Sequence, residues 1–275
     1  MRTPPLPRER ALLLTRAQLA AIRDIQAAVP GADITFLPLD LASFASVAAA
    51  AAQFHGRERA LHVLVNNAGI MAPAAYTQTA DGYELQFGTN YMGHFLLTRL
   101  LLPALERVAA ASAPGAVRIV NISSFAHNMA VCGIDTADLH KQLAGANTWV
   151  AYGVSKLANI QHARALAKRH PAVLSVSLHP GMVASEIYND PNSGNMLTRA
   201  LGPYAKSVAE GSMCQLCCAV GSRVSLADNG EYFVPPGIKG SDGWFFEKAS
   251  KYGRSDEASD ALWEWSEKEV AKHGY

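Results

Sequence analysis

The chain has 275 residues, of which 49% are hydrophobic and 17% are charged. Disordered chains combine low hydrophobicity with high net charge, so this composition excludes disorder. The 24 basic and 23 acidic residues leave a net charge of +1, which offers no basic field for a phosphate backbone, and we expect no nucleic-acid partner. The length suits one domain over residues 1–275, with residues 1–10 as a poorly ordered tail.

The sequence also argues against a membrane span. A spanning helix needs about 20 apolar residues, but the run FLLTRLLLPAL is eleven residues long and contains Arg99. The N-terminal residues lack a signal-like apolar stretch, so we expect a cytoplasmic location. The four cysteines are too few for a disulfide framework, and the segment MCQLCC reads as part of a core helix.

Apolar strand patterns alternate with helical patterns along the chain. We expect strands at 11–15, 34–37, 61–65, 117–122, 173–178 and 231–234. Between and after them we expect helices at 17–28, 43–54, 82–110, 152–169, 207–220 and 256–272. Ser43 would cap the helix at 43–54, and Pro103 would bend the helix at 82–110. This alternation predicts an α/β fold, a doubly wound, Rossmann-like parallel sheet covered on both faces.

The segment Tyr152-Gly-Val-Ser-Lys156 carries a candidate acid–base pair. Residues four apart lie on one face of a helix. A phenol ordinarily has a pKa near 10, and a neighbouring ammonium group lowers it towards the range that proton transfer requires. By itself the pattern is weak, because exposed helices produce such pairs by chance.

Polar residues follow several of the predicted strands, where ligands of open α/β sheets bind. Ser123 and Ser124 end the strand at 117–122, and Asn66-Asn67-Ala68-Gly69 ends the strand at 61–65. The serines could instead satisfy backbone groups of a turn. Asn90 lies inside a predicted helix, where asparagine is a poor helix former, so a specific role is expected.

Together these motifs resemble the short-chain dehydrogenase/reductase family, in family order from about residue 12 to Gly181. The details are most similar to the retinol-dehydrogenase-like branch, on four segments: Asp40-Leu-Ala-Ser, Thr79-Ala-Asp-Gly, Gly93-His-Phe and Ser155-Lys-Leu-Ala-Asn. The resemblance implies a nicotinamide cofactor and a small alcohol, ketone or aldehyde as substrate.

The resemblance also implies catalytic roles. Tyr152 would donate or accept the proton at the substrate oxygen, and Lys156 would lower its pKa and bind the nicotinamide ribose. Ser124 would orient and polarise the carbonyl. Asn90 would hold a water in a proton relay towards Lys156.

Further residues would bind the cofactor by the same resemblance. Asn67 and Ala68 would lie along the adenosine ribose, and Asp40 would meet the adenine edge. Val183 and Ser185 would contact the carboxamide.

Arg16 bears on the choice of cofactor, because it follows the expected strand at 11–15. A basic residue there favours the 2′-phosphate of NADP, and an acidic one favours the free ribose of NAD. We therefore expect NADP rather than NAD. The alternative is that Arg16 is an ordinary solvated loop charge.

The family's first strand and its Thr-Gly-x-x-x-Gly-Ile-Gly turn have no counterpart in this sequence, where none of the 21 glycines precedes Gly31. That turn cradles the pyrophosphate at a helix N-terminus. We therefore expect the first β-α unit to be missing, with strand edges left unpaired.

Three functions stay open from the sequence. The first is an oxidoreductase, either one whose natural N-terminus is absent from this sequence or a short form that still binds NADP weakly. The second is a non-catalytic relative that acts as a binding or assembly partner. The third, an acylating serine enzyme, lacks the expected Gly-x-Ser-x-Gly or Ser-x-x-Lys spacing. Residues 186–206 are expected to form the substrate loop, and the helices at 82–110 and 152–169 to pair in a homodimer.

Overall fold

The computed structural model describes residues 7–184, 205–240 and 248–275. The chain divides into two compact units, Met1–Leu39 and Asp40–Tyr275. The expected single domain over residues 1–275 therefore stays a prediction. Of the expected tail at 1–10, residues 7–10 belong to a helix and residues 1–6 lie outside the described part.

The first unit contains helix α1, Pro7–Ala28. The strand expected at 11–15 is wrong, because those residues are helical, so Arg16 follows no strand. A short apolar run does not distinguish a strand from a helix. Here Pro7 starts the first turn, where its missing N–H costs nothing, and leucine, alanine, arginine and glutamine favour the helix.

The strand expected at 34–37 is also wrong, since residues 33–40 make no strand pairing. Phe36 and Leu39 are 40% and 39% exposed, so this segment does not bury the apolar face that a strand of a parallel sheet buries.

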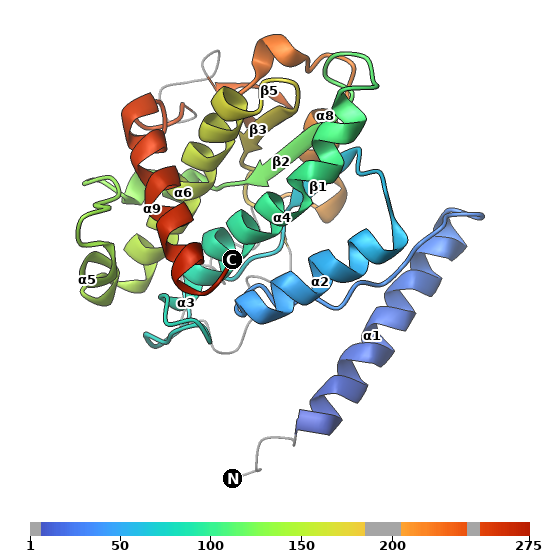
Figure 1. Cartoon of the computed structure of the whole chain (residues 1–275), viewed down its shortest axis with the longest axis horizontal. Coiled ribbons are helices and arrows are strands. Elements are labelled where there is room, and N and C mark those ends of the chain that lie inside the picture. The colour runs from blue at the N-terminus through green and yellow to red at the C-terminus, as the bar shows by residue number, and fades with distance from the viewer. Residues whose placement is uncertain (1–6, 185–204, 241–247) are drawn as a thin grey trace. The chain divides into compact units, whose positions relative to one another are not determined.

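The second unit holds a five-stranded sheet in the order β1-β2-β3-β4-β5 (Figure 1). Its strands are β1 Val63–Asn66, β2 Arg118–Ile122, β3 Leu174–Leu178, β4 Tyr232–Val234 and β5 Ile238–Lys239. The first four are parallel and β5 is antiparallel to β4. The predicted α/β fold is confirmed, and β5 is an addition that two residues were too short to signal.

Helices cover both faces of this sheet, as side-chain alternation along a strand requires. On β2, Ile119 packs with the cluster of Leu105 and Leu166, from helices α4, Gly93–Ala109, and α6, Thr148–Arg169. The adjacent Val120 packs on the other side against Cys214 of helix α8, Val208–Val220.

The single helix expected at 82–110 is three segments. A short turn, α3, Leu85–Phe87, leads into a π-helical turn, Gly88–Met92, and then into α4. Asn90 lies in the π turn, and π turns occur frequently at functional sites. Pro103 lies inside α4 as expected.

Three further helices begin at serine caps, of which only the one at Ser43 was predicted from the sequence. Ser43 caps α2, Phe44–Arg57, Ser207 caps α8, and Ser255 caps α9, Asp256–Lys272. Among the described residues, three short helices were not anticipated: Phe125–Met129, Leu139–Ala144 and Leu226–Asp228. Within the described ranges no helix is long and apolar enough to cross a membrane.

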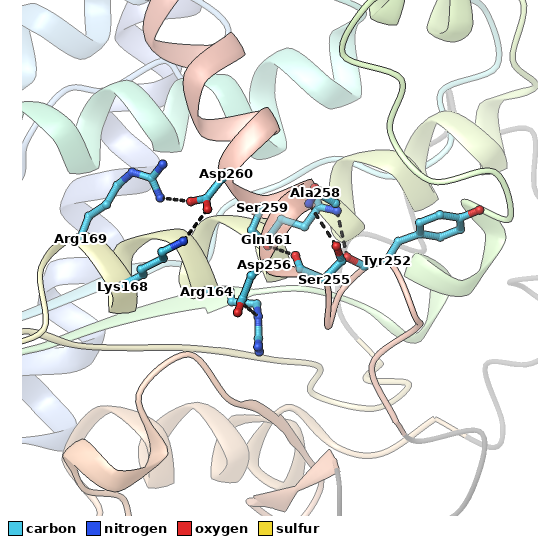
Figure 2. Close-up of polar contacts among 10 residues, drawn as sticks. All are labelled: Gln161, Arg164, Lys168, Arg169, Tyr252, Ser255, Asp256, Ala258, Ser259 and Asp260. Carbon is cyan, nitrogen blue, oxygen red and sulfur yellow. Dashed lines mark hydrogen bonds and ion pairs between the residues drawn. The ribbon is translucent and has the colours of Figure 1, made fainter.

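The C-terminal helix α9 lies alongside α6 (Figure 1) and is tied to it by charged side chains (Figure 2). Arg164 pairs with Asp256, while Lys168 and Arg169 both pair with Asp260. Pairs of this kind at the protein surface contribute about 0–1 kcal/mol each. Their main effect is to hold α9 against the helix that carries Tyr152 and Lys156.

Strand β1 is an edge of the described sheet, since it pairs only with β2. Its Val65 is 41% exposed, and Val63 and Leu64 are half-buried. In a parallel sheet the faces of the strands are ordinarily covered by helices. The expectation of an unpaired, partly exposed apolar edge therefore agrees with the described residues.

Candidate functional site

A cavity of about 550 Å³ opens at the carboxyl ends of β1, β2 and β3, the edge where open α/β sheets bind ligands. Its volume lies within the range of about 300–1,000 Å³ typical of small-molecule sites. The residues that line it are Asn67, Ala68, Gly69, Met71, Ile122, Ser123, Ser124, Tyr152, Lys156, Pro180, Gly181, Val183, Val208, Gly211, Ser212 and Gln215.

Tyr152 and Lys156 stand together in this cavity on one face of α6. The Lys156 Nζ lies 5.6 Å from the centre of the Tyr152 ring and donates to the Ile122 carbonyl oxygen at 3.1 Å. Both side chains are buried. Burial lowers the pKa of Lys156 from 10.5 to about 8, because a low-dielectric surrounding disfavours the ammonium form. The positive charge of Lys156 in this position stabilises a negatively charged or polarised oxygen atom beside it.

Ser124 faces the same cavity from the end of β2. Its Oγ accepts from the Ala126 backbone N–H at 3.1 Å, so its own hydroxyl proton is available for a ligand oxygen. The neighbouring Ser123 has a structural contact instead, because its Oγ donates to the Lys156 carbonyl oxygen at 2.7 Å.

Gly153 allows the Ser124 segment to approach α6. A Cβ at Gly153 would lie 2.6 Å from the Ala126 carbonyl oxygen and 2.9 Å from the Met129 Cβ. Any side chain at this position would push the segment that follows Ser124 away from Tyr152. The missing side chain therefore helps to set the distance between the two candidate catalytic groups.

Asn90 lies behind the cavity wall and is fully buried. Its Oδ1 accepts from the Ile70 N–H at 2.9 Å, and its Nδ2 donates to the Ile70 carbonyl at 3.0 Å and to the Ser155 Oγ at 3.0 Å. The side chain thus ties the loop after β1 to α6. The expected role in a water relay towards Lys156 stays a prediction.

The loops after β1 and β3 complete the wall. At Gly69 a Cβ would lie 2.9 Å from the Asn90 Oδ1 and 3.5 Å from the Lys156 Nζ, so this loop crosses closely over both side chains. A Cβ at Gly211 of α8 would lie 2.3 Å from the Val183 Cγ2. Gly211 therefore lets Val183 pack against α8 at the rim of the cavity.

The structure brings six of the predicted site residues to the cavity: Asn67, Ala68, Ser124, Tyr152, Lys156 and Val183. Asp40 does not line it; its carboxylate accepts from the Ala42 N–H at 2.9 Å. Ser185 and the side chain of Arg16 lie outside the described residues.

Sequence reasoning missed the contribution of α8, namely Val208, Gly211, Ser212 and Gln215. The signal was present in Gly211, since a glycine inside a helix marks a close approach. Gln215 Oε1 is buried without a hydrogen-bond partner among the described residues. This oxygen has almost no accessible surface, so Gln215 lines the cavity through its other atoms.

Comparisons with known proteins agree with this arrangement. A family model described as short chain dehydrogenase matches residues 10–136. The short-chain dehydrogenase/reductase drtF of Aspergillus calidoustus is 38% identical over 268 residues, which cover 92% of this chain and 82% of that protein. Mouse retinol dehydrogenase 12 is 38% identical over 216 residues, which cover 78% of this chain and 65% of that protein.

Solved structures show the same fold. The NADPH-bound carbonyl reductase from chicken fatty liver superposes with a TM-score of 0.55 at 26% identity, covering 86% of this chain and 84% of that one. A carbonyl reductase of D. melanogaster, Sniffer, has a TM-score of 0.55 at 22% identity, covering 82% and 84% of the two chains. The chain therefore belongs to the short-chain dehydrogenase/reductase family, as a retinol-dehydrogenase-like member, and is an NAD(P)-dependent oxidoreductase.

Proposed function

We propose that this protein interconverts an alcohol and a ketone or aldehyde on a small, largely apolar substrate, with NADP as cofactor and Tyr152 as the proton donor or acceptor. The observation that carries the proposal is the buried pair of Tyr152 and Lys156 beside Ser124 in one cavity. These groups provide a titratable proton, a cation and a hydroxyl donor in the same cavity.

The residues present fit the nicotinamide end of the cofactor. Lys156 and Tyr152 would hold the nicotinamide ribose, Asn67 and Ala68 would lie along the adenosine ribose, and Val183 would contact the carboxamide. When bound, the cofactor supplies or accepts the hydride.

The chain's own groups would handle the proton. For reduction, Ser124 donates a hydrogen bond to the substrate carbonyl, and Tyr152 gives its phenolic proton to the same oxygen as charge develops there. The ammonium of Lys156 stabilises the resulting phenolate. For oxidation the same groups act in reverse, with the phenolate as base. Lys156 reaches this position because its Nζ is anchored on the Ile122 carbonyl.

The substrate class follows from the cavity lining and from the relatives. Met71, Ile122, Val183 and Val208 give the cavity apolar walls in addition to the polar groups of Ser124, Tyr152 and Lys156. One relative is named for retinol and two structural neighbours are named carbonyl reductases. One of these two carbonyl reductases is NADPH-bound, which supports NADP as the cofactor.

Consumption of NADPH and of NADH with a panel of aliphatic and aromatic aldehydes and ketones tests the proposal. We expect turnover with NADPH and a loss of about 10²-fold in kcat for Ser124→Ala, the size expected when one hydrogen-bond donor to a developing oxyanion is removed. Equal activity of Ser124→Ala and wild type would refute the assigned role of Ser124. No turnover with either cofactor would favour the non-catalytic binding partner.

Assembly and location complete the proposal. The two-fold homodimer is the commonest form among protein oligomers, and we propose that this chain forms one. We also propose that the protein is located in the cytoplasm. Because α9 lies against α6 within the protomer, the pairing surface would have to include other residues than the expected helix faces. Light scattering at micromolar concentration should give twice the chain mass, and the mass of one chain would contradict it.

A further inference from the structure

His127 is buried three residues after Ser124, in the short helix Phe125–Met129. Its Nδ1 lies 2.7 Å from the Ser124 carbonyl oxygen, and its Nε2 lies 3.1 Å from the Ser250 backbone nitrogen, whose N–H points at it. The His127 ring therefore spans two segments more than 120 residues apart in sequence. His127 is not among the residues that line the cavity, so a direct contact with a substrate does not explain its position.

The partners of the ring determine which nitrogen carries the proton. A carbonyl oxygen can only accept and a backbone N–H can only donate. The Ser124 and Ser250 contacts together place the proton on Nδ1 and leave Nε2 bare to accept from Ser250, although the Lys248 carbonyl also acts on the ring as an acceptor. The opposite tautomer would set a lone pair against the Ser124 oxygen and two hydrogens against each other at Ser250.

The surroundings also favour the neutral form of the ring. Burial lowers the pKa of His127, and this outweighs the carbonyl groups of Ser124 and Lys248, which raise it. The ring packs edge-on against Tyr232 of β4 at 5.3 Å between centres, and Tyr232 stacks on His179 at 5.9 Å. His179 directly precedes Pro180 and Gly181 of the cavity wall. The aromatic stack thus fixes the ring in place.

We propose that His127 is a positioning residue that fixes the backbone of Ser124 so that the Ser124 hydroxyl points into the cavity. The Ser124 carbonyl accepts both from the His127 Nδ1 and, at 3.0 Å, from the His127 backbone N–H. This double contact holds Ser124 in an extended conformation (φ −154°, ψ 155°) with its Oγ on the Ala126 N–H. The inference rests on the proposed role of Ser124 in the reaction.

Two conservative substitutions separate the two hydrogen bonds of the ring. The asparagine amide nitrogen is one bond from Cγ, as Nδ1 is, so His127→Asn can retain the donor to Ser124 and loses the acceptor for Ser250. The glutamine amide is one bond further out, as Nε2 is, so His127→Gln can retain the acceptor for Ser250 and loses the donor to Ser124.

We expect opposite effects of the two variants on turnover. His127→Gln should lower kcat by roughly 10- to 100-fold, the range caused by small misplacement of a reacting group, with little change in KM. His127→Asn should retain kcat within about threefold of wild type. Asn128→Ala, an exposed neighbour in the same short helix, is the matched control and should leave both parameters unchanged. Retention of kcat by His127→Gln and loss by His127→Asn would overturn the proposal.

A second measurement is independent of activity. Amide hydrogen exchange should accelerate at Ala126 in His127→Gln, because the Ser124 cap is released, and at Ser250 in His127→Asn. Nitrogen-15 chemical shifts of the wild-type ring should show a protonated Nδ1 and a bare Nε2. If wild type turns over no carbonyl compound, the proposed function fails and the exchange pattern decides this inference alone. Faster exchange at both amides in both variants, or a protonated Nε2, would refute it.

Discussion

The buried ammonium of Lys156 should destabilise the folded protein at neutral pH. Lysine has a pKa of 10.5 when exposed, and that of Lys156 is about 8 in the folded state. Each pKa unit corresponds to about 1.4 kcal/mol, so keeping Lys156 charged in the fold costs about 3 kcal/mol at pH 7. Functional sites commonly hold such unfavourable charges.

Lys156→Met removes this cost with a side chain of similar length. The substitution loses one hydrogen bond to the Ile122 carbonyl, which contributes about 1 kcal/mol. That carbonyl keeps a donor, the Asn159 Nδ2 at 2.9 Å. We therefore expect Lys156→Met to be more stable than wild type by about 2 kcal/mol at pH 7, while its activity is lost.

The stability gain of Lys156→Met over wild type should decrease as the pH rises. Between the folded pKa of about 8 and the unfolded pKa of 10.5, the unfolded wild type binds more protons than the folded one, so wild-type stability rises with pH. The advantage of Lys156→Met should be constant below pH 8 and disappear by about pH 10.5.

Urea denaturation followed by tryptophan fluorescence from pH 6 to pH 10.5 measures this difference. Lys168→Met on the same helix is the control, because the Lys168 side chain is 59% exposed and its removal relieves no burial. A variant less stable than wild type at pH 7, or a difference that does not change with pH, would refute the reasoning.

Two further predictions concern cofactor binding and packing. The 275-residue chain should bind NADPH with a dissociation constant well above the micromolar range. The reason is that several charge-assisted hydrogen bonds to the cofactor, of about 1.5–3 kcal/mol each, depend on a glycine-rich turn that this sequence lacks. Titration calorimetry that shows low-micromolar binding would contradict this prediction. Gly153→Ala should lower the free energy of unfolding by about 1–3 kcal/mol and should lower kcat, because the new Cβ would lie 2.6 Å from the Ala126 carbonyl oxygen. Unchanged stability and kcat would show that the close approach is not needed.

The sequence predicted the second unit well, because its elements carry local signals. Ser43 and Ser207 mark helix starts through their caps. The strands around Ile119 and Val176 are short segments rich in valine, isoleucine and leucine, and every residue in both is buried. The position of Tyr152 and Lys156 at the carboxyl edge of the sheet also follows from topology, since strand ends of a parallel sheet meet at one edge.

The errors have physical causes as well. The run at 11–15 is helical because helix formers flank it, and the run at 34–37 makes no strand pairing. The contribution of α8 to the cavity could not be predicted in detail, because the contact of Gly211 with Val183 depends on tertiary packing. The side-chain contacts of Asn90 with Ile70 and Ser155 depend on it equally.

The most direct test of the proposed chemistry is the turnover of Tyr152→Phe, which removes one hydroxyl and retains the ring. Tyr76→Phe is the matched control, since Tyr76 is 50% exposed and does not line the cavity. With the NADPH-dependent reduction of a carbonyl compound as the assay, Tyr152→Phe should lose about 10²- to 10⁴-fold in kcat, while its thermal unfolding stays close to that of wild type. Activity of Tyr152→Phe above about a tenth of wild type would contradict the assignment of Tyr152 as the proton donor, because a general acid contributes at least about 10²-fold.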